Sequence, residues 1–142
     1  MNIRYLFKAI DTNSVWRTGL LIALKGDRCT IEESDGSKWA CDAKTLCQCT
    51  GLKDKNGKLI WENDILHNGN YFVVKWNESC SRFDIVLNKF CNIPIGKWEP
   101  MICDWKTNDF KEYRKAVDYE VIGNVFDNPK LLGIEVDEEI ER

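Results

Sequence analysis

The sequence predicts a mainly β protein, all-β or α+β, in which an N-terminal antiparallel meander packs on a small SH3-like barrel with one short helix. Three observations lead to this prediction. Short runs of alternating apolar and polar residues recur along the chain, clusters of Gly, Asn, Asp and Ser separate them, and a single stretch has helical spacing. With 142 residues, 44% of them hydrophobic, the chain can bury a core without covalent crosslinks.

The N-terminal part carries the pattern of a meander. An alternating strand begins at Ile3, and the next runs from Val15 to Leu24. Two shorter strands, at 29–32 and 38–41, follow after turn clusters. Strands spaced this closely pair with their neighbours, so we expect one antiparallel sheet over residues 1–44.

The middle of the chain holds the clearest turn signals. Asn56-Gly57 is the dipeptide preferred in tight hairpins with positive φ at both central residues. Asn63-Asp64 predicts a second bend that starts a strand. Two further alternating runs, at 71–76 and 82–87, are expected to pair with each other.

The C-terminal part has weaker patterns. Residues 89–107 predict no definite structure beyond loop and a short strand. Apolar residues at i, i+3 and i+7 predict a short amphipathic helix over 108–117. A final strand is expected at 119–126, and Asn-Pro followed by a closing Gly predicts one helical turn over 128–133.

These elements divide the chain into three parts: a β-meander subdomain over 1–48, a barrel-like domain over 49–133 and an acidic tail over 134–142. The net charge is −3, and the tail accounts for the acidic excess. The remaining body is nearly neutral and has no basic stripe, which argues against strong steering toward phosphate. We expect the tail to be a solvated end rather than an interaction arm.

The cysteines and the absence of targeting signals predict a cytosolic protein. Seven cysteines are an odd number, and no secretion signal precedes them, so reduced and mostly buried thiols are favoured over disulfides. No apolar run approaches the ~20 residues that a membrane span needs, so no membrane partner is expected.

Metal binding and catalysis have few candidate residues. Cys47 and Cys49 share one face of a strand, and Cys41 and His67 are the obvious further ligands. This spacing is tighter than that of zinc knuckles, so packed thiols are favoured over a metal site. His67 is the single histidine, and no phosphate-binding loop or acid–base pair accompanies it. We therefore expect no enzymatic activity and no cofactor.

Two segments have a recognisable pattern. Thr50–Ile65 resembles the signature segment of the YopX family of phage and prophage proteins, and Val121–Leu132 resembles its closing motif. Residues 77–118 match nothing specific. The family usually has Gly where this chain has Asn63, and Asn tolerates a left-handed backbone, so we expect the turn to be kept. The resemblance implies a β-rich fold and a phage or prophage origin, but no biochemical role.

Most of the motif residues are expected to be structural. Asp54 and Asn56 would set turn geometry, and Gly123 would let two backbones approach closely. The members expected to be exposed, Trp61, Glu62 and Asp64, form the candidate binding surface.

The function expected from these observations is that of a non-enzymatic accessory protein that binds another macromolecule, with a host protein as the first candidate. The alternative is a nucleic-acid-binding module, because Trp and Tyr on a small β platform can stack on bases while Lys and Arg follow the backbone. An unpaired edge strand of the meander would favour homo-oligomers.

Overall fold

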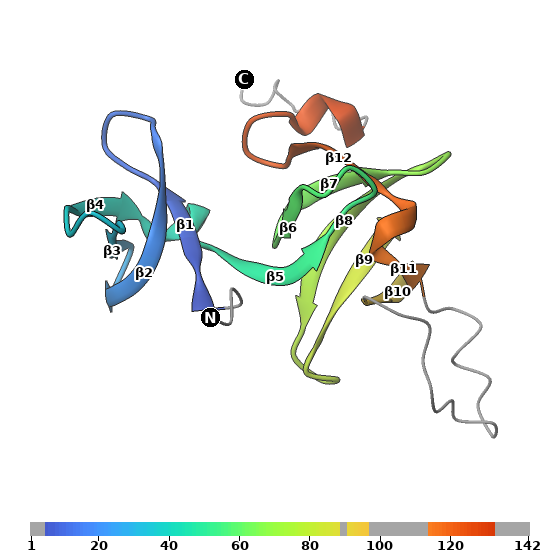
Figure 1. Ribbon diagram of the computed structural model, residues 1–142, viewed down its shortest axis with the longest axis horizontal. Coiled ribbons are helices and arrows are strands. Elements are labelled where there is room, and N and C mark those ends of the chain that lie inside the picture. Colours follow the sequence, from blue (N-terminus) through green and yellow to red (C-terminus); the bar gives the residue numbers. More distant parts are fainter. Residues whose placement is uncertain (1–4, 89–90, 97–113, 133–142) are drawn as a thin grey trace. The chain divides into compact units, whose positions relative to one another are not determined.

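The computed structural model describes residues 5–88, 91–96 and 114–132. Within these ranges the chain is mainly β, as predicted, and its helices are short 3-10 turns. It divides into two compact units, Met1–Gly51 and Leu52–Arg142, which we describe separately (Figure 1). No helix in the described part of the chain is long and apolar enough to cross a membrane.

Unit 1 is an antiparallel meander around a small core. Its sheet has the strand order β4-β3-β2-β1-β5-β6, in which β5 leads into unit 2 and β6 belongs to that unit. The boundary predicted after residue 48 falls within β5. The core consists of Ile31, Ala9, Cys29 and Cys41. The two cysteines pack in it as small hydrophobic side chains. The elements are β1 (Phe7–Ile10), β2 (Trp16–Lys25), β3 (Arg28–Glu32), β4 (Lys38–Asp42), the 3-10 turn η2 (Ala43–Thr45) and β5 (Cys47–Lys53).

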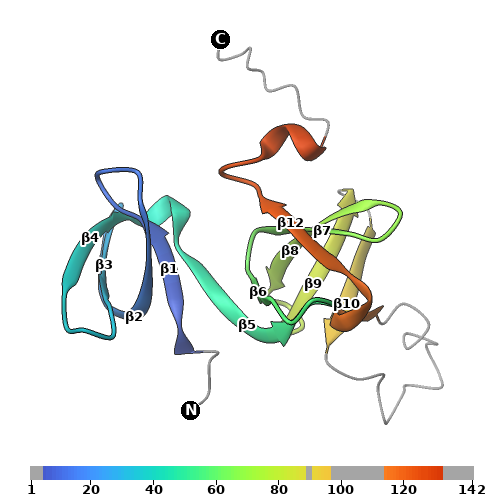
Figure 2. The same cartoon turned by 45° about the horizontal axis from the view of Figure 1, so that its top comes forward.

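Unit 2 contains a sheet with the order β11-β10-β9-β8-β7-β12. The last strand, β12, pairs antiparallel with β7, so the last strand in sequence lies beside the first strand of this sheet (Figure 2). The elements are β6 (Leu59–Trp61), β7 (Asp64–His67), β8 (Tyr71–Asn77), β9 (Arg82–Asn88), β10 (Cys91–Gly96), β11 (Arg114–Lys115), η4 (Ala116–Asp118), β12 (Glu120–Asn124) and η5 (Pro129–Leu132).

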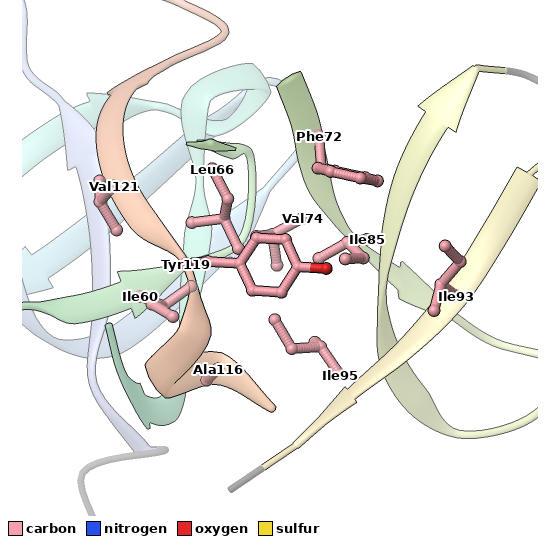
Figure 3. Close-up of a cluster of buried hydrophobic side chains, with 10 residues drawn as sticks. All are labelled: Ile60, Leu66, Phe72, Val74, Ile85, Ile93, Ile95, Ala116, Tyr119 and Val121. Atoms are coloured by element: carbon pink, nitrogen blue, oxygen red, sulfur yellow. The ribbon is translucent and has the colours of Figure 1, made fainter. Parts of the chain in front are cut away.

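The core of unit 2 is larger and gathers around Tyr119 (Figure 3). The Tyr119 ring meets the Phe72 ring edge-on, with centroids 5.5 Å apart. Val74 and Ile85, which face each other across β8 and β9, are fully buried beneath them. Alternate residues of the central strands therefore supply the core, as the alternating sequence pattern predicts.

The described strands of unit 2 do not close into the small SH3-like barrel that the sequence predicts. β11 and β12 stand at opposite ends of the strand order, and each pairs with a single neighbour among the described strands. β11 has two residues, and the chain then leaves the sheet through η4 before β12 begins. The sheet therefore remains open.

The predicted helices have different outcomes. Residues 108–113 of the expected amphipathic helix lie outside the described residues, as does the acidic tail. Residues 114–117 form β11 and the start of η4 rather than an α-helix, because the parallel pairing of β11 with β10 overrides the local spacing. The helical turn expected after Asn128 is confirmed as η5, which has Pro129 at its first position.

Three hairpin turns of the chain share one geometry. In each, the N–H of the fourth residue donates to the carbonyl of the first, and the fourth residue has positive φ. A turn followed by one left-handed residue is the usual way to join strands by a loop of this length. The three turns begin at Asp11, Glu33 and Asp54, and their left-handed residues are Ser14 (φ 65°), Gly36 (φ 89°) and Gly57 (φ 80°).

This geometry corrects one turn prediction and confirms another. Asn56-Gly57 was expected to occupy the two centres of a tight turn, but Gly57 alone has positive φ and it stands at the fourth position. The three-residue loop arises because Asp54 closes the turn by bonding to Lys58 across it. The prediction for Asn63 is confirmed, since its φ is 72°.

We predict that Ser14→Gly raises the stability of unit 1. A left-handed conformation costs a residue with a Cβ about 1–2 kcal/mol, and glycine avoids this at an entropic cost of about 0.5–1 kcal/mol. The net gain should be up to about 1 kcal/mol in chemical denaturation. Ser34→Gly, in an exposed turn residue without positive φ, is the control and should be neutral or destabilising; an equal gain in both variants would contradict the explanation.

Candidate functional site

The carboxylate of Asp54 joins the two segments that the sequence singles out. Its Oδ1 accepts hydrogen bonds from the backbone N–H groups of Asn56 (2.9 Å) and Lys58 (2.8 Å). Its Oδ2 accepts from the N–H of Val121 (2.8 Å), 67 residues further along the chain. Asp54 is 3% exposed. One side chain therefore shapes the β5–β6 hairpin and fixes the start of β12 on it.

The bonding of Asp54 depends on its ionised form. Burial raises the pKa of the Asp54 carboxyl, but the N–H donors of Val121, Lys58 and Asn56 outweigh burial and leave the pKa below its usual value. At neutral pH the group is therefore a carboxylate, with each donor directed at a negative oxygen.

Asn63 makes a second connection between the segments. Its N–H donates to the carbonyl of Val74 (2.8 Å), and its own carbonyl accepts from the N–H of Val125 (3.0 Å). Its side-chain Oδ1 accepts from the Nζ of Lys75 (2.8 Å). The left-handed backbone of Asn63 thus ties the bend after β6 to both β8 and the end of β12.

The three residues predicted to form a binding surface are not an exposed group. Trp61 is 9% exposed, Asp64 is 3% exposed and Glu62 is half-buried. The Oδ2 of Asp64 accepts a hydrogen bond from the N–H of Trp61 (2.8 Å), so this carboxylate closes the bend from within. Two of the three residues therefore have a structural role, and the part of all three in binding stays a prediction.

Gly123 was expected to let two backbones approach, but the space that its missing Cβ leaves is taken by the side chain of Asn128. A Cβ at this position would lie 2.4 Å from the Oδ1 of Asn128. That oxygen accepts from the N–H of Asn124 (3.2 Å), while the N–H of Asn128 donates to the carbonyl of Asn124 (2.8 Å). The closing motif is thus folded on itself by its own asparagines.

A polar cluster on β8 and β9 was not predicted from the sequence. Asp84 is 0% exposed, and its two oxygens accept from Nδ2 of Asn77 (2.8 Å) and Nε of Arg82 (2.7 Å). Lys75 lies directly opposite Asp84 in the strand register. A buried carboxylate is retained only where such partners satisfy it. The alternation of apolar and polar residues in 82–87 indicates which residues share a face of β9. The cluster becomes visible only when the pairing of β9 with β8 is known.

The other face of the same two strands carries an exposed aromatic residue. Trp76 is 43% exposed and lies opposite Phe83 in the register. The rings meet at 69° with centroids 4.9 Å apart, and Phe83 packs on the core of unit 2. The Trp76 ring is therefore held in place while much of its surface faces solvent.

Unit 1 has its own charged network around Arg17. The guanidinium lies 3.4 Å from the centroid of the Trp39 ring, its Nε donates to Oδ2 of Asp11 (2.8 Å), and its NH1 lies 3.7 Å from a carboxylate oxygen of Glu33. The bond from Arg17, followed by the N–H of Val15, holds the pKa of Asp11 below its usual value. Every group in this network has an internal partner, which favours a structural role.

The predicted burial of the thiols is confirmed for Cys29, Cys41, Cys47 and Cys49, whereas Cys80 is exposed. Burial raises the pKa of Cys29, and burial with the neighbouring Cys29 raises that of Cys41 to about 11. Among the described residues, no three His, Cys, Asp or Glu side chains come together in a way that could hold a metal ion.

His67 has an aromatic neighbour. Its ring lies 4.9 Å from that of Tyr71, with the ring planes 43° apart. The two residues face each other directly across β7 and β8. This contact stacks the imidazole at the end of the hairpin, in unit 2, while the cysteines considered as metal ligands lie in unit 1.

The fold and these contacts define a small all-β protein in which several buried polar residues form hydrogen bonds at turns and strand ends. The chain belongs to the YopX family: the family model described as YopX protein matches residues 11–133. A solved structure, the crystal structure of protein EF1440 from Enterococcus faecalis, is similar over 89% of this chain and 96% of that chain, with 23% identity and a TM-score of 0.46. A search of curated proteins finds no match.

We predict that Asp54→Ala destabilises unit 2 by about 2–4 kcal/mol, because it leaves the buried N–H of Val121 without an acceptor and removes two further hydrogen bonds of the hairpin turn. Asp118→Ala removes an exposed carboxylate from the same unit and should change stability little. The measurement is chemical denaturation followed by tryptophan fluorescence. Equal stability of the two variants would show that the Asp54 bonds contribute nothing net.

Acid should weaken the same contact. A carboxyl with a lowered folded pKa stabilises the fold above its unfolded pKa of about 3.9, and this contribution is lost as pH falls through the folded value. We therefore expect the protection factor of the Val121 amide, which is its intrinsic exchange rate divided by the rate measured by NMR at the same pH, to fall once pH drops below about 4. In Asp54→Asn the protection of the Val121 amide should not show this loss at acid pH. The same dependence of protection on pH in that variant as in the parent protein would contradict the assignment.

Proposed function

We propose that this protein is a non-enzymatic accessory protein of a phage or prophage that acts in the host cytoplasm by binding another protein. The observation that carries the proposal is the exposed, immobilised ring of Trp76. Trp is a residue that folded proteins usually bury extensively. Where it stays exposed on a rigid support, it is the side chain that most often supplies binding energy at protein interfaces.

The surroundings of Trp76 favour a protein partner over a nucleic acid. The two nearest cations on these strands are engaged: Lys75 bonds to the side chain of Asn63, and Arg82 bonds to the buried Asp84. Binding to a phosphate backbone needs cations that can exchange their counterions for phosphates. Cations already paired within the fold serve that purpose poorly.

The chemistry of the described hollows supports a non-enzymatic role. A hollow of about 220 Å³ in unit 1 is lined by Cys41 together with Asp11, Asp27 and Asp42. The thiolate is the nucleophilic form of cysteine, and the pKa of Cys41, raised to about 11, keeps it protonated at neutral pH. Neighbouring carboxylates disfavour the thiolate further.

A second candidate function is nucleic-acid binding, favoured by one feature of the β5–β6 hairpin. Lys53, Lys55 and Lys58 are all exposed there. Three lysines around one turn could contact phosphates, with a moderate dependence on salt.

We predict that Trp76→Ala lowers affinity for the protein partner about thirtyfold, the effect of losing a binding hot spot of about 2 kcal/mol. The full chain is immobilised and exposed to lysate of the host bacterium, and retained proteins are quantified by mass spectrometry, identified, purified and titrated. Tyr71→Ala is the matched control, because Tyr71 is also 43% exposed but stacks on His67 rather than on the core. Glu62→Ala tests the surface predicted from the sequence.

The alternative has its own measurement. Binding of fluorescent single-stranded DNA would be titrated at several salt concentrations with the parent chain and with Lys53, Lys55 and Lys58 replaced by Gln. Salt-dependent binding lost in that variant, together with no protein retained through Trp76, would replace the proposed function by the second candidate.

A further inference from the structure

In the second half of strand β2, Leu20–Lys25, one edge has no paired strand among the described residues. Gly19 is the last residue along β2 that pairs with β1, opposite Phe7. From Leu20 to Lys25 the strand pairs with β3, and the described part of the chain supplies no strand for its other edge. Alternate residues of this half-strand direct their backbone N–H and C=O groups to that edge, and from these groups another strand could continue the sheet.

The residues of this half-strand do not prevent another strand from pairing with its edge. Its sequence is Leu-Leu-Ile-Ala-Leu-Lys, and Leu20, Ile22 and Leu24 are 47%, 44% and 58% exposed. Proteins usually block a free edge with a charged residue pointing from its middle, or with proline. Here the single charge, Lys25, stands at the end. A bulge at Ile22 bends the strand but leaves the run apolar.

The charged residues near the two ends of the half-strand have opposite signs. Leu20 lies opposite Glu32, and Lys25 lies opposite Arg28, so each pair shares a face of the sheet. Arg28 and Glu32 are four residues apart on β3 and therefore also share that face. One end of the half-strand is thus basic and the other acidic. Lys38 pairs with Glu32 from β4, on the side away from the free edge.

We propose that a second copy of this chain pairs with the free edge of β2, antiparallel across a two-fold axis, so that the sheets of two unit 1 domains become continuous. This arrangement places the apolar run of one copy against that of the other. It also brings Lys25 of each copy to the Leu20 end of its partner, where Glu32 lies two strand spacings away, about 10 Å, within reach of two long side chains. Parallel pairing would instead place Lys25 beside Lys25, which is unfavourable.

A hollow at the acidic end fits the same arrangement. It measures about 650 Å³ and is lined by Leu20, Glu32 and the turn from Glu33 to Gly36, together with Thr18 and Leu6. An incoming lysine would bury its aliphatic stem against the leucines while its ammonium group meets the carboxylates. The same surface therefore supplies both halves of the contact, as an isologous interface requires.

The first test is the mass of the full chain in solution, measured by sedimentation equilibrium. We expect a dimer for the parent protein and a monomer for Ile22→Lys, which places a charge in the middle of the edge. Val117→Lys is the control, because Val117 is a similarly exposed apolar residue (48%) in unit 2, and it should stay dimeric. Circular dichroism checks that each variant is folded. A monomeric parent chain, or a dimer unchanged by Ile22→Lys in the folded state, would overturn the proposal.

The second test uses the charges. The double variant Lys25→Glu with Arg28→Glu places acidic groups at both ends, and Glu32→Lys places basic groups at both. Each should self-associate at least tenfold more weakly than the parent, and an equimolar mixture should restore dimers, because each acidic end then faces a basic one. Failure of the mixture to associate more tightly than its components would exclude the antiparallel arrangement. The outcome does not depend on the partner proposed for Trp76.

Discussion

The fold of unit 2 depends on the hydrogen bonds that the buried carboxylate of Asp54 accepts. This carboxylate bonds within its own hairpin and also to the N–H of Val121, 67 residues away in sequence. Bringing such distant segments together costs loop-closure entropy, which the contacts at the junction must offset. Once Val121 is held, β12 can pair with β7, and Tyr119, two residues earlier, is placed in the core. The junction therefore couples a local turn to the long-range topology.

Unit 1 uses the same device at shorter range. Asp11 opens a hairpin turn of the same form, and its Oδ1 accepts from N–H groups within that turn. Its Oδ2 bonds to the side chain of Arg17, six residues away, instead of to a distant backbone group. Arg17 then stacks on Trp39 and so reaches β4. Unit 1 is thus organised by contacts along a meander, whereas unit 2 needs its two ends to meet before its core is complete.

This difference explains what the sequence could predict. Most strands, most turns and the left-handed Asn63 follow from local spacing and residue type and agree with the prediction. The register of Asn56-Gly57 was wrong, β10 lies in a segment expected to be mainly loop, and β11 stands where the end of a helix was expected. The open sheet depends on where β11 and β12 pair, and the burial of Trp61 depends on tertiary packing, which local patterns do not specify. Asp84 was missed for the same reason, since its partners become visible only with the register of β8 and β9. Long-range pairing decides both the closure of the sheet and the exposure of candidate site residues.

The motifs that identify the family are therefore poor guides to what the protein binds. Asp54 and Asp64 accept hydrogen bonds from backbone N–H groups of the protein, and the side chain of Asn63 accepts one from Lys75. A group used in this way has little capacity left for a ligand. Surfaces that contact a partner must be sought where side chains are exposed and held but not engaged internally. In the described chain the ring of Trp76 meets that condition in unit 2, and the half-strand from Leu20 to Lys25 meets it in unit 1. Neither lies in the signature segments, so the two proposed contacts use parts of the chain other than those by which the sequence resembles the family.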